Sequence, residues 1–84
     1  MFMLNTEIRY DYDEEEDVLY LSIGEPKPSI TEETEEGILI RKDIQTGKLT
    51  GVTILDYKDR LKNKERINIP DIFDLSKVKI QEEN

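Results

Sequence analysis

Residues 12–21 read Tyr-Asp-Glu-Glu-Glu-Asp-Val-Leu-Tyr-Leu, and this stretch decides the fold of the chain. Its five consecutive acidic side chains would repel one another inside a helix or strand, so we predict a solvated hairpin loop over residues 13–17. Before the loop, apolar residues from Ile8 to Tyr12 alternate with polar ones, and this period of two predicts a strand. After the loop, residues 18–23 predict a second strand, antiparallel to the first.

The second predicted strand is apolar on both faces, which is typical of a strand that is covered on both sides. Alternation places Leu19, Leu21 and Ile23 on one face and Val18 and Tyr20 on the other. A sheet this small with two apolar faces needs a cover on each. Either the chain's own tail or another subunit covers the face that carries Val18 and Tyr20, and we expect a homodimer. The predicted interface residues are Val18, Tyr20, Leu39 and Leu55.

Two further strands are predicted over residues 38–42 and 49–56, joined by a turn with Gly47 at a positive φ. Gly51, inside the last strand, indicates a bulge or the close approach of a neighbouring group. Residues 30–34 are compatible with a short edge strand, although their charge argues against one. The predicted fold class is therefore mainly β, an antiparallel β-meander of about four strands with a short helical turn and a C-terminal strapping segment.

The chain of 84 residues predicts a single domain with a thin core. We expect the sheet over residues 8–57, a helical turn over residues 57–64 and a C-terminal extension, residues 58–80, that packs on the sheet. Short strands are expected in this extension at residues 66–69 and 77–80. Residues 1–6 and 81–84 are expected to be disordered.

Composition excludes several classes of function. The chain has no Cys and no His, which removes thiol chemistry, the usual general base and the commonest nitrogen ligand of transition metals. Its formal charge of −8 argues against direct binding to nucleic acid or to an anionic membrane. No apolar run has the length of a membrane span, and we expect a cytoplasmic protein.

The acidic loop suggests a hard-cation site, because Asp11, Asp13, Glu15 and Asp17 are spaced like alternate oxygen ligands. An EF-hand loop that begins at Asp11 would need Gly at its sixth position and an acid at its twelfth. The chain has Glu16 and Ser22 there, so a hairpin turn is the favoured interpretation. We expect no metal and no cofactor.

Basic residues near the Gly47 turn could attract a phosphate, namely Arg41, Lys42 and Lys48. However, the sequence has no Gly-rich loop that leads into a helix, which is the usual anion cradle.

Several short motifs resemble a family of small prokaryotic domains known only as domain of unknown function 2283. The resemblance covers residues 8–57, and the motifs that carry it are Tyr12-Asp13, the gap of three residues, Asp17-Val18-Leu19-Tyr20-Leu21 and Gly47-Lys48-Leu49-Thr50-Gly51-Val52-Thr53-Ile54-Leu55-Asp56. It implies a compact β-rich domain and no established activity, and it supplies no catalytic residues. The family's Glu in the last strand is Thr53 here, and the tail from Lys58 onward lies outside the match.

These observations predict a non-catalytic interaction or regulatory module, not an enzyme, that self-associates as a dimer through its sheet, with another protein as a second candidate partner. One alternative is an acidic protein that neutralises a partner, as an antitoxin or a nucleic-acid mimic does. A second alternative is a divalent-cation-dependent binder. Acids clustered on one face would favour the first alternative, and carboxylates that converge in a pocket would favour the second.

Overall fold

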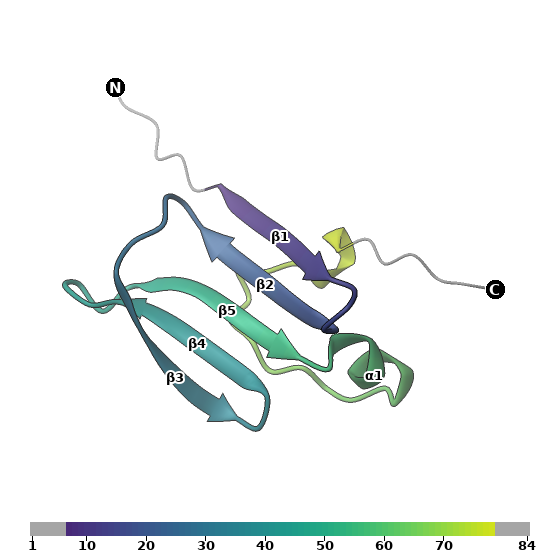
Figure 1. Ribbon diagram of the computed structural model, residues 1–84. Coiled ribbons are helices and arrows are strands. Elements are labelled where there is room, and N and C mark those ends of the chain that lie inside the picture. Colours follow the sequence, from purple (N-terminus) through teal and green to yellow (C-terminus); the bar gives the residue numbers. More distant parts are fainter. Residues whose placement is uncertain (1–6, 79–84) are drawn as a thin grey trace.

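The computed structural model describes residues 7–78 of the chain. Five antiparallel strands form one sheet, followed by one short helix and a 3₁₀ turn (Figure 1). The elements are β1 (Ile8–Asp13), β2 (Val18–Ile23), β3 (Ser29–Glu35), β4 (Ile38–Asp43), β5 (Leu49–Leu55), α1 (Tyr57–Lys62) and η1 (Leu75–Lys77). The mainly β class is confirmed, but the expected number of about four strands is one too few.

The additional strand is β3, which lies at the edge of the sheet beside β4. Six of its seven residues are exposed, and its acidic side chains left little apolar signal in the sequence. β3 is nevertheless a strand because its backbone completes the hydrogen bonding of β4, while charge on an edge strand discourages pairing with another chain.

The strand order is β1-β2-β5-β4-β3, so the predicted simple meander is wrong (Figure 1). β2 pairs with β5 instead of β3, and the connection over residues 24–28 passes the end of the sheet to reach the far edge (Figure 1). This order puts the two most apolar strands, β2 and β5, side by side, where both gain the most burial. The acidic β3 takes the edge.

The core consists of cross-strand rows on one face of the sheet. Leu19 lies opposite Ile54, which in turn lies opposite Ile38, and all three are fully buried. The neighbouring row joins Leu21, Val52 and Ile40, and Tyr10 and Tyr12 of β1 pack against these rows at the other edge.

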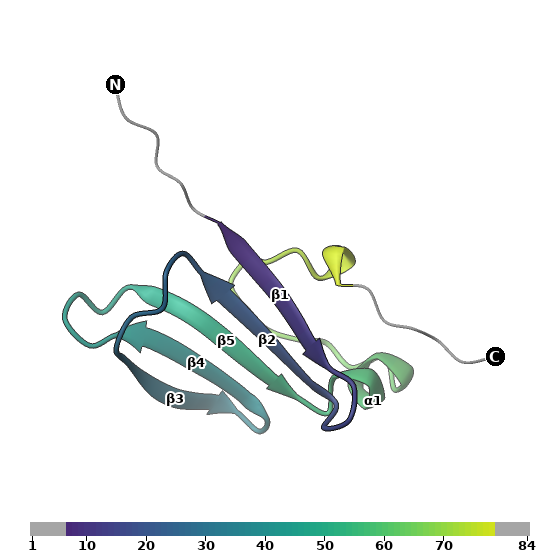
Figure 2. The same cartoon turned by 45° about the horizontal axis from the view of Figure 1, so that its top comes forward.

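The C-terminal segment lies against this core face, behind the sheet in the views of Figures 1 and 2. Tyr57 and Phe73 are buried there, and the side chains partly buried beside them are Ile67, Ile69, Leu75 and Val78. The segment crosses the sheet without joining it, because residues 65–70 form no strand, and the strand predicted at residues 66–69 is therefore wrong.

The strand predicted at residues 77–80 is not supported within the described part of the chain, since Lys77 belongs to η1. Lys79 and Ile80 lie outside the described residues, as do the termini predicted to be disordered, residues 1–6 and 81–84. Among residues 7–78, no helix combines the length and the apolar character needed to cross a membrane.

Candidate functional site

The face of the sheet opposite the tail carries the four residues predicted to form an interface. Val18 of β2 pairs with Leu55 of β5, and Tyr20 of β2 and Leu39 of β4 both lie opposite Thr53, which is between them on β5. Their side chains alternate with core residues along each strand, so all of them project from the face that the tail does not cover. We call this surface the uncovered face.

Exposure differs among the four residues. Tyr20 is 40% exposed, Leu39 and Leu55 are half-buried, and Val18 is 9% exposed. Asp11 lies opposite Tyr20 at one edge of the sheet. The uncovered face therefore presents an aromatic side chain and two aliphatic ones beside a carboxylate.

The acidic residues considered as cation ligands do not converge. Asp11 lies on β1, Glu15 is exposed in the hairpin turn, and Asp13 accepts a hydrogen bond of 3.2 Å from the backbone N–H of Glu16. Among the described residues, only Asp17 belongs to a group of close carboxylates, together with Asp56 and Asp59, whose ligand atoms lie within 4.8 Å of one another.

The Asp17 carboxylate instead accepts hydrogen bonds from other groups of the protein. Its Oδ1 accepts hydrogen bonds of 2.7 Å from the hydroxyl of Tyr12 and of 2.7 Å from the backbone N–H of Lys58, and its Oδ2 accepts one of 3.4 Å from the N–H of Asp59. Lys58 and Asp59 belong to the first turn of α1, whose own N-cap residue, Asp56, makes no side-chain capping bond. Asp17 thus caps the helix from a turn far away in the sequence.

These hydrogen bonds shift the pKa values of two side chains, Asp17 and Tyr12. Partial burial acts to raise the pKa of Asp17, but the hydrogen bonds from Lys58, Tyr12 and Asp59 outweigh it and hold that pKa below its usual value. Burial first, and then the hydrogen bond to the Asp17 carboxylate, raise the pKa of Tyr12 to about 12. A carboxylate engaged in this way serves the fold, and nothing else at the cluster points to a cation.

Arg41 lies on the uncovered face and contacts a residue that the sequence did not indicate. The sequence groups it with Lys42 and Lys48 near the Gly47 turn, but its Nη2 donates a hydrogen bond of 2.8 Å across β5 to the backbone carbonyl of Leu21. Gly51 permits this path, because a Cβ there would clash with the guanidinium and lie 2.6 Å from the Leu21 oxygen. The close approach and the bulge predicted from Gly51 are both confirmed, the bulge as a register shift between Arg41 and Lys42. The signal for this contact was that Arg41 alternates with the core residues of β4 and lies opposite Gly51.

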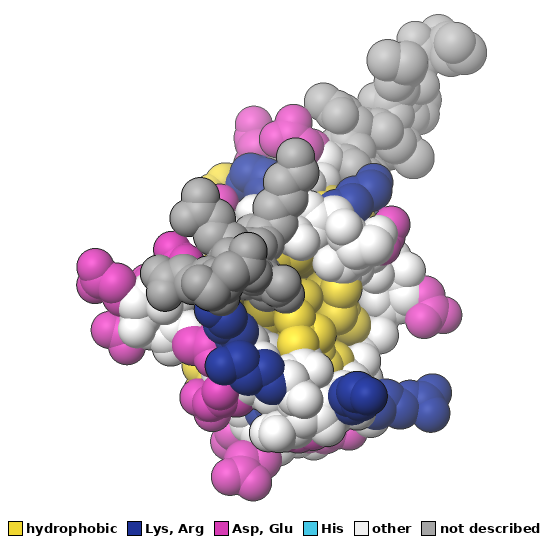
Figure 3. All heavy atoms as spheres, turned by 90° about the vertical axis from the view of Figure 1, so that its right-hand side faces the viewer, with side chains coloured by type: hydrophobic (Ala, Val, Ile, Leu, Met, Phe, Trp, Pro, Cys, Tyr) yellow, Lys and Arg dark blue, Asp and Glu magenta, His cyan; other side chains and the backbone are white. Residues whose placement is uncertain are grey.

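Charge is distributed unevenly in the view of the molecule from the side of α1 and η1. Hydrophobic side chains gather at the centre of this view, with basic side chains beside them and acidic side chains around the rim (Figure 3). The acids visible from this side are thus spread over the periphery and do not form one continuous patch.

The comparison with protein families supports the match suggested by the sequence motifs. The model of the family described as "Protein of unknown function (DUF2283)" matches residues 9–58, which include all of β2 to β5 and most of β1. No curated protein and no solved structure matches the chain. Because the matched region spans more than half of the sequence, the chain belongs to the DUF2283 family.

Proposed function

We propose that the protein is a non-catalytic cytoplasmic interaction module that self-associates as a dimer through the uncovered face of its sheet. The observation that carries the proposal is the position of Val18, Tyr20, Leu39 and Leu55 on adjacent strands of the face opposite the tail.

Burial of apolar surface is the physical reason for association. The tail covers the core face, so a second copy is the simplest cover for the other, and two-fold pairing is the commonest way in which identical chains close an interface. Tyr20 is suited to the centre of such a contact, because a Tyr side chain combines a large apolar area with a polar end. Asp11, beside Tyr20, would lie at the polar rim.

The non-catalytic part of the proposal rests on chemistry. The sequence contains neither His nor Cys, and the carboxylate with the strongest set of hydrogen bonds, Asp17, is engaged in capping α1. No pair of nucleophile and base emerges among the described residues of the uncovered face.

The test is sedimentation equilibrium over a range of protein concentrations, applied to the wild type and to Tyr20→Ser. We expect a dimer for the wild type and a dissociation constant at least about thirty-fold weaker for the variant, since truncating a central aromatic residue costs about 2 kcal/mol or more. The matched control is Ile44→Ser, which removes an exposed apolar side chain from the turn between β4 and β5.

Two results would overturn the proposal. A wild type that stays monomeric at high micromolar concentration would remove self-association. A dimer that is unaffected by Tyr20→Ser, or is weakened equally by Ile44→Ser, would move the interface away from the uncovered face. Circular dichroism of both variants shows whether the fold is retained.

A further inference from the structure

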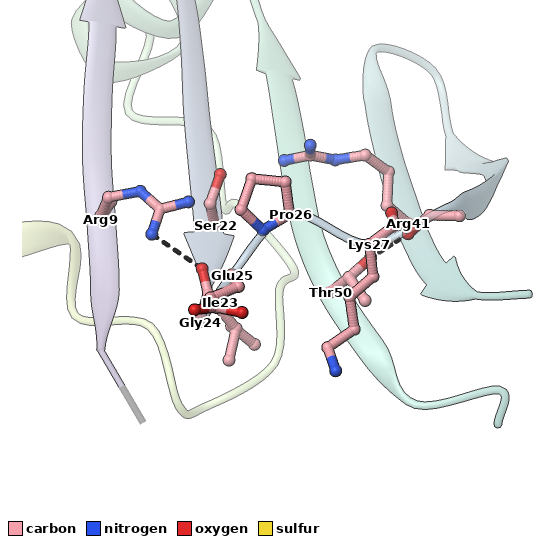
Figure 4. A pocket seen from close by; sticks show the side chains of 10 residues that line it. Arg9, Ser22, Ile23, Gly24, Glu25, Pro26, Lys27, Arg41 and Thr50 are labelled. Carbon is pink, nitrogen blue, oxygen red and sulfur yellow. Dashed lines mark hydrogen bonds between the residues drawn. The ribbon is translucent and has the colours of Figure 1, made fainter. Parts of the chain in front are cut away.

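A small cavity lies at the other end of the uncovered face, where the connection over residues 24–28 passes the sheet. Its volume is about 170 Å³, roughly the volume of five or six water molecules. Arg9 on β1, Ser22 on β2 and Arg41 on β4 line it from the sheet, and Lys27 lines it from the connection. Figure 4 shows the two arginine side chains reaching inward from opposite sides, with Ser22 and Pro26 between them.

Among the described residues neither arginine has a carboxylate partner, although the chain has 20 acidic and 12 basic residues. Within residues 7–78, the ion pairs are Lys42 with Glu32 and Arg60 with Glu65, and neither Arg9 nor Arg41 takes part in one. Each half-buried guanidinium instead donates to a backbone carbonyl, Arg9 to Gly24 at 2.7 Å and Arg41 to Leu21 at 2.8 Å. One bond to a neutral acceptor leaves most of the five N–H donors of each group unused among the described residues.

The Nε atom of Arg41 gives a second, independent indication. It is buried, and within the described part of the chain it has no hydrogen-bond partner. A buried charged donor without a partner costs free energy, and in a native protein it commonly marks the place of a water or an ion. The charge of this guanidinium is therefore poorly compensated by residues 7–78.

Two hydroxyl groups in the wall use their protons within the protein, which leaves Ser22 as the hydroxyl donor for a ligand. Ser29 and Thr50 also line the cavity, where their hydroxyls share a hydrogen bond of 2.8 Å, and the Ser29 hydroxyl also donates to the carbonyl of Lys27 at 2.8 Å. Glu25 is the one acid among the residues that line the cavity, and it is exposed. Around this cavity, three cationic side chains thus face a single carboxylate in a chain whose net charge is −8.

We propose that this cavity binds a phosphate group, with Arg9 and Arg41 as its principal ligands and Lys27 and Ser22 as auxiliary donors. A tetrahedral oxyanion accepts hydrogen bonds from several directions at once, which suits two guanidinium groups on opposite walls and a hydroxyl between them. The volume is large enough for a phosphate group, which is either free or the end of a larger molecule that extends beyond the cavity.

The phosphate site does not depend on dimer formation. On each of three strands, the residue of the phosphate site is two positions away from a residue at the proposed dimer interface. The pairs are Arg9 and Asp11 on β1, Ser22 and Tyr20 on β2, and Arg41 and Leu39 on β4. The site is therefore complete within one chain, and a monomeric protein would disprove the proposed dimer while leaving phosphate binding measurable.

The test is a titration of the full chain with inorganic phosphate at constant ionic strength, followed by ¹H–¹⁵N NMR of the arginine Nε–Hε groups. We expect saturable shifts at Arg9 and Arg41 and none at Arg60, which is paired with Glu65 and serves as an internal reference. Parallel titrations with acetate and phenyl phosphate test the geometry. Phenyl phosphate should bind like inorganic phosphate, and acetate should bind at least about tenfold more weakly.

Two variants locate the site. Arg9→Gln should weaken phosphate binding about tenfold, because it removes a charge-assisted donor, whereas Arg66→Gln removes the same charge from an exposed position in the tail and should leave it unchanged. Lys27→Gln, at an exposed position, should weaken binding severalfold and covers the case in which Arg9→Gln fails to fold. Shifts that do not saturate, equal effects of Arg9→Gln and Arg66→Gln, or acetate binding as tightly as phosphate would each overturn the assignment.

Discussion

At Asp17 one carboxylate holds together two parts of the chain that are far apart in the sequence. The residue ends the acidic turn with a φ of 55°, an uncommon backbone conformation for a residue other than glycine. Asp and Asn tolerate this conformation better than other residues, and here it brings the carboxylate to the first turn of α1. The acidic run in the sequence thus includes one residue with a specific structural role.

Replacing Asp17 by Asn should lower the free energy of unfolding by about 1 to 2 kcal/mol near neutral pH, because a charged helix cap is replaced by a neutral one. The folded-state pKa of Asp17 lies below its unfolded value, so its contribution is fully present above about pH 4 and is lost as the pH falls through the folded pKa. The difference in stability between wild type and variant should therefore shrink below about pH 4. Urea unfolding at about pH 7 and at about pH 3 measures both effects.

The matched control for that experiment is Asp11→Asn, because Asp11 is exposed in β1 and its carboxylate accepts no hydrogen bond among the described residues. Equal stability of Asp17→Asn and wild type at neutral pH would contradict the capping role. So would an Asp11→Asn variant with the same loss.

Single residues also show what the sequence could and could not predict. Gly51 signalled a close approach because glycine is unfavourable in a strand, but the sequence did not reveal that the approaching group is Arg41. The pairing of Asp17 with α1 was equally out of reach, since it depends on how two distant segments meet in space. Sequence patterns report which face a side chain takes, whereas contacts between distant segments depend on the strand order.

At the scale of elements, β1 and β2 were predictable because alternation and the acidic turn are local signals. β3 appeared in the sequence only as a short edge strand compatible with residues 30–34, because it is held by the backbone of β4 and its side chains contribute little to the core. The position of β5 between β2 and β4 was also missed, since sequential neighbours are the usual partners in a sheet and here β2 and β3 are not neighbours.

The tail was predictable in its role but not in its conformation. Its apolar residues indicated a cover for the sheet, yet Pro70 and the spacing of the isoleucines are compatible with strands as well as with irregular structure. Contacts with the core decide the outcome: Ile67, Ile69 and Phe73 reach the sheet from an irregular backbone.

Phe73 is the main anchor of the tail and gives the prediction at this scale. Phe73→Ala should lower the free energy of unfolding by about 3 to 4 kcal/mol, because it removes a side chain that is only 6% exposed and leaves a cavity against the core. Ile72→Ala, its immediate neighbour at 48% exposure, should change stability by about 0.5 kcal/mol or less. Urea unfolding followed by far-UV circular dichroism measures both values.

A domain of this size has little stability to lose, and Phe73→Ala can unfold it altogether. Phe73→Leu keeps most of the apolar volume and should cost about 1.5 kcal/mol, within a measurable range. Equal effects at Phe73 and Ile72 would show that the tail does not contribute through this buried contact.

At the scale of the whole molecule, the sheet has two faces with different roles. One face is closed by the chain's own tail, and the other combines an apolar end with a cationic cavity. Apart from Asp11 beside Tyr20 and Glu25 at the cavity, many of the described acids lie in the β1–β2 turn, along the β3 edge, in α1 and in the tail. This distribution explains how a chain with a charge of −8 can still hold a cationic cavity.

Such an excess of negative charge should itself destabilise the folded chain, because folding brings the carboxylates closer together. The prediction is sharpest at Glu15, an exposed residue in the middle of the acidic turn. Glu15→Lys changes the formal charge from −8 to −6 and should raise the free energy of unfolding by up to about 1 kcal/mol at low ionic strength. Glu15→Gln should give about half of that gain, because it removes the charge without reversing it.

Both gains in the free energy of unfolding should fade between about 0.05 M and 0.5 M NaCl, because the Debye length falls below the spacing of the acids. Urea unfolding at the two salt concentrations measures this change. A gain from Glu15→Lys that persists unchanged at high salt would mean that the lysine acts through a new contact, and a loss at low salt would show that the acidic turn is stabilising as it stands.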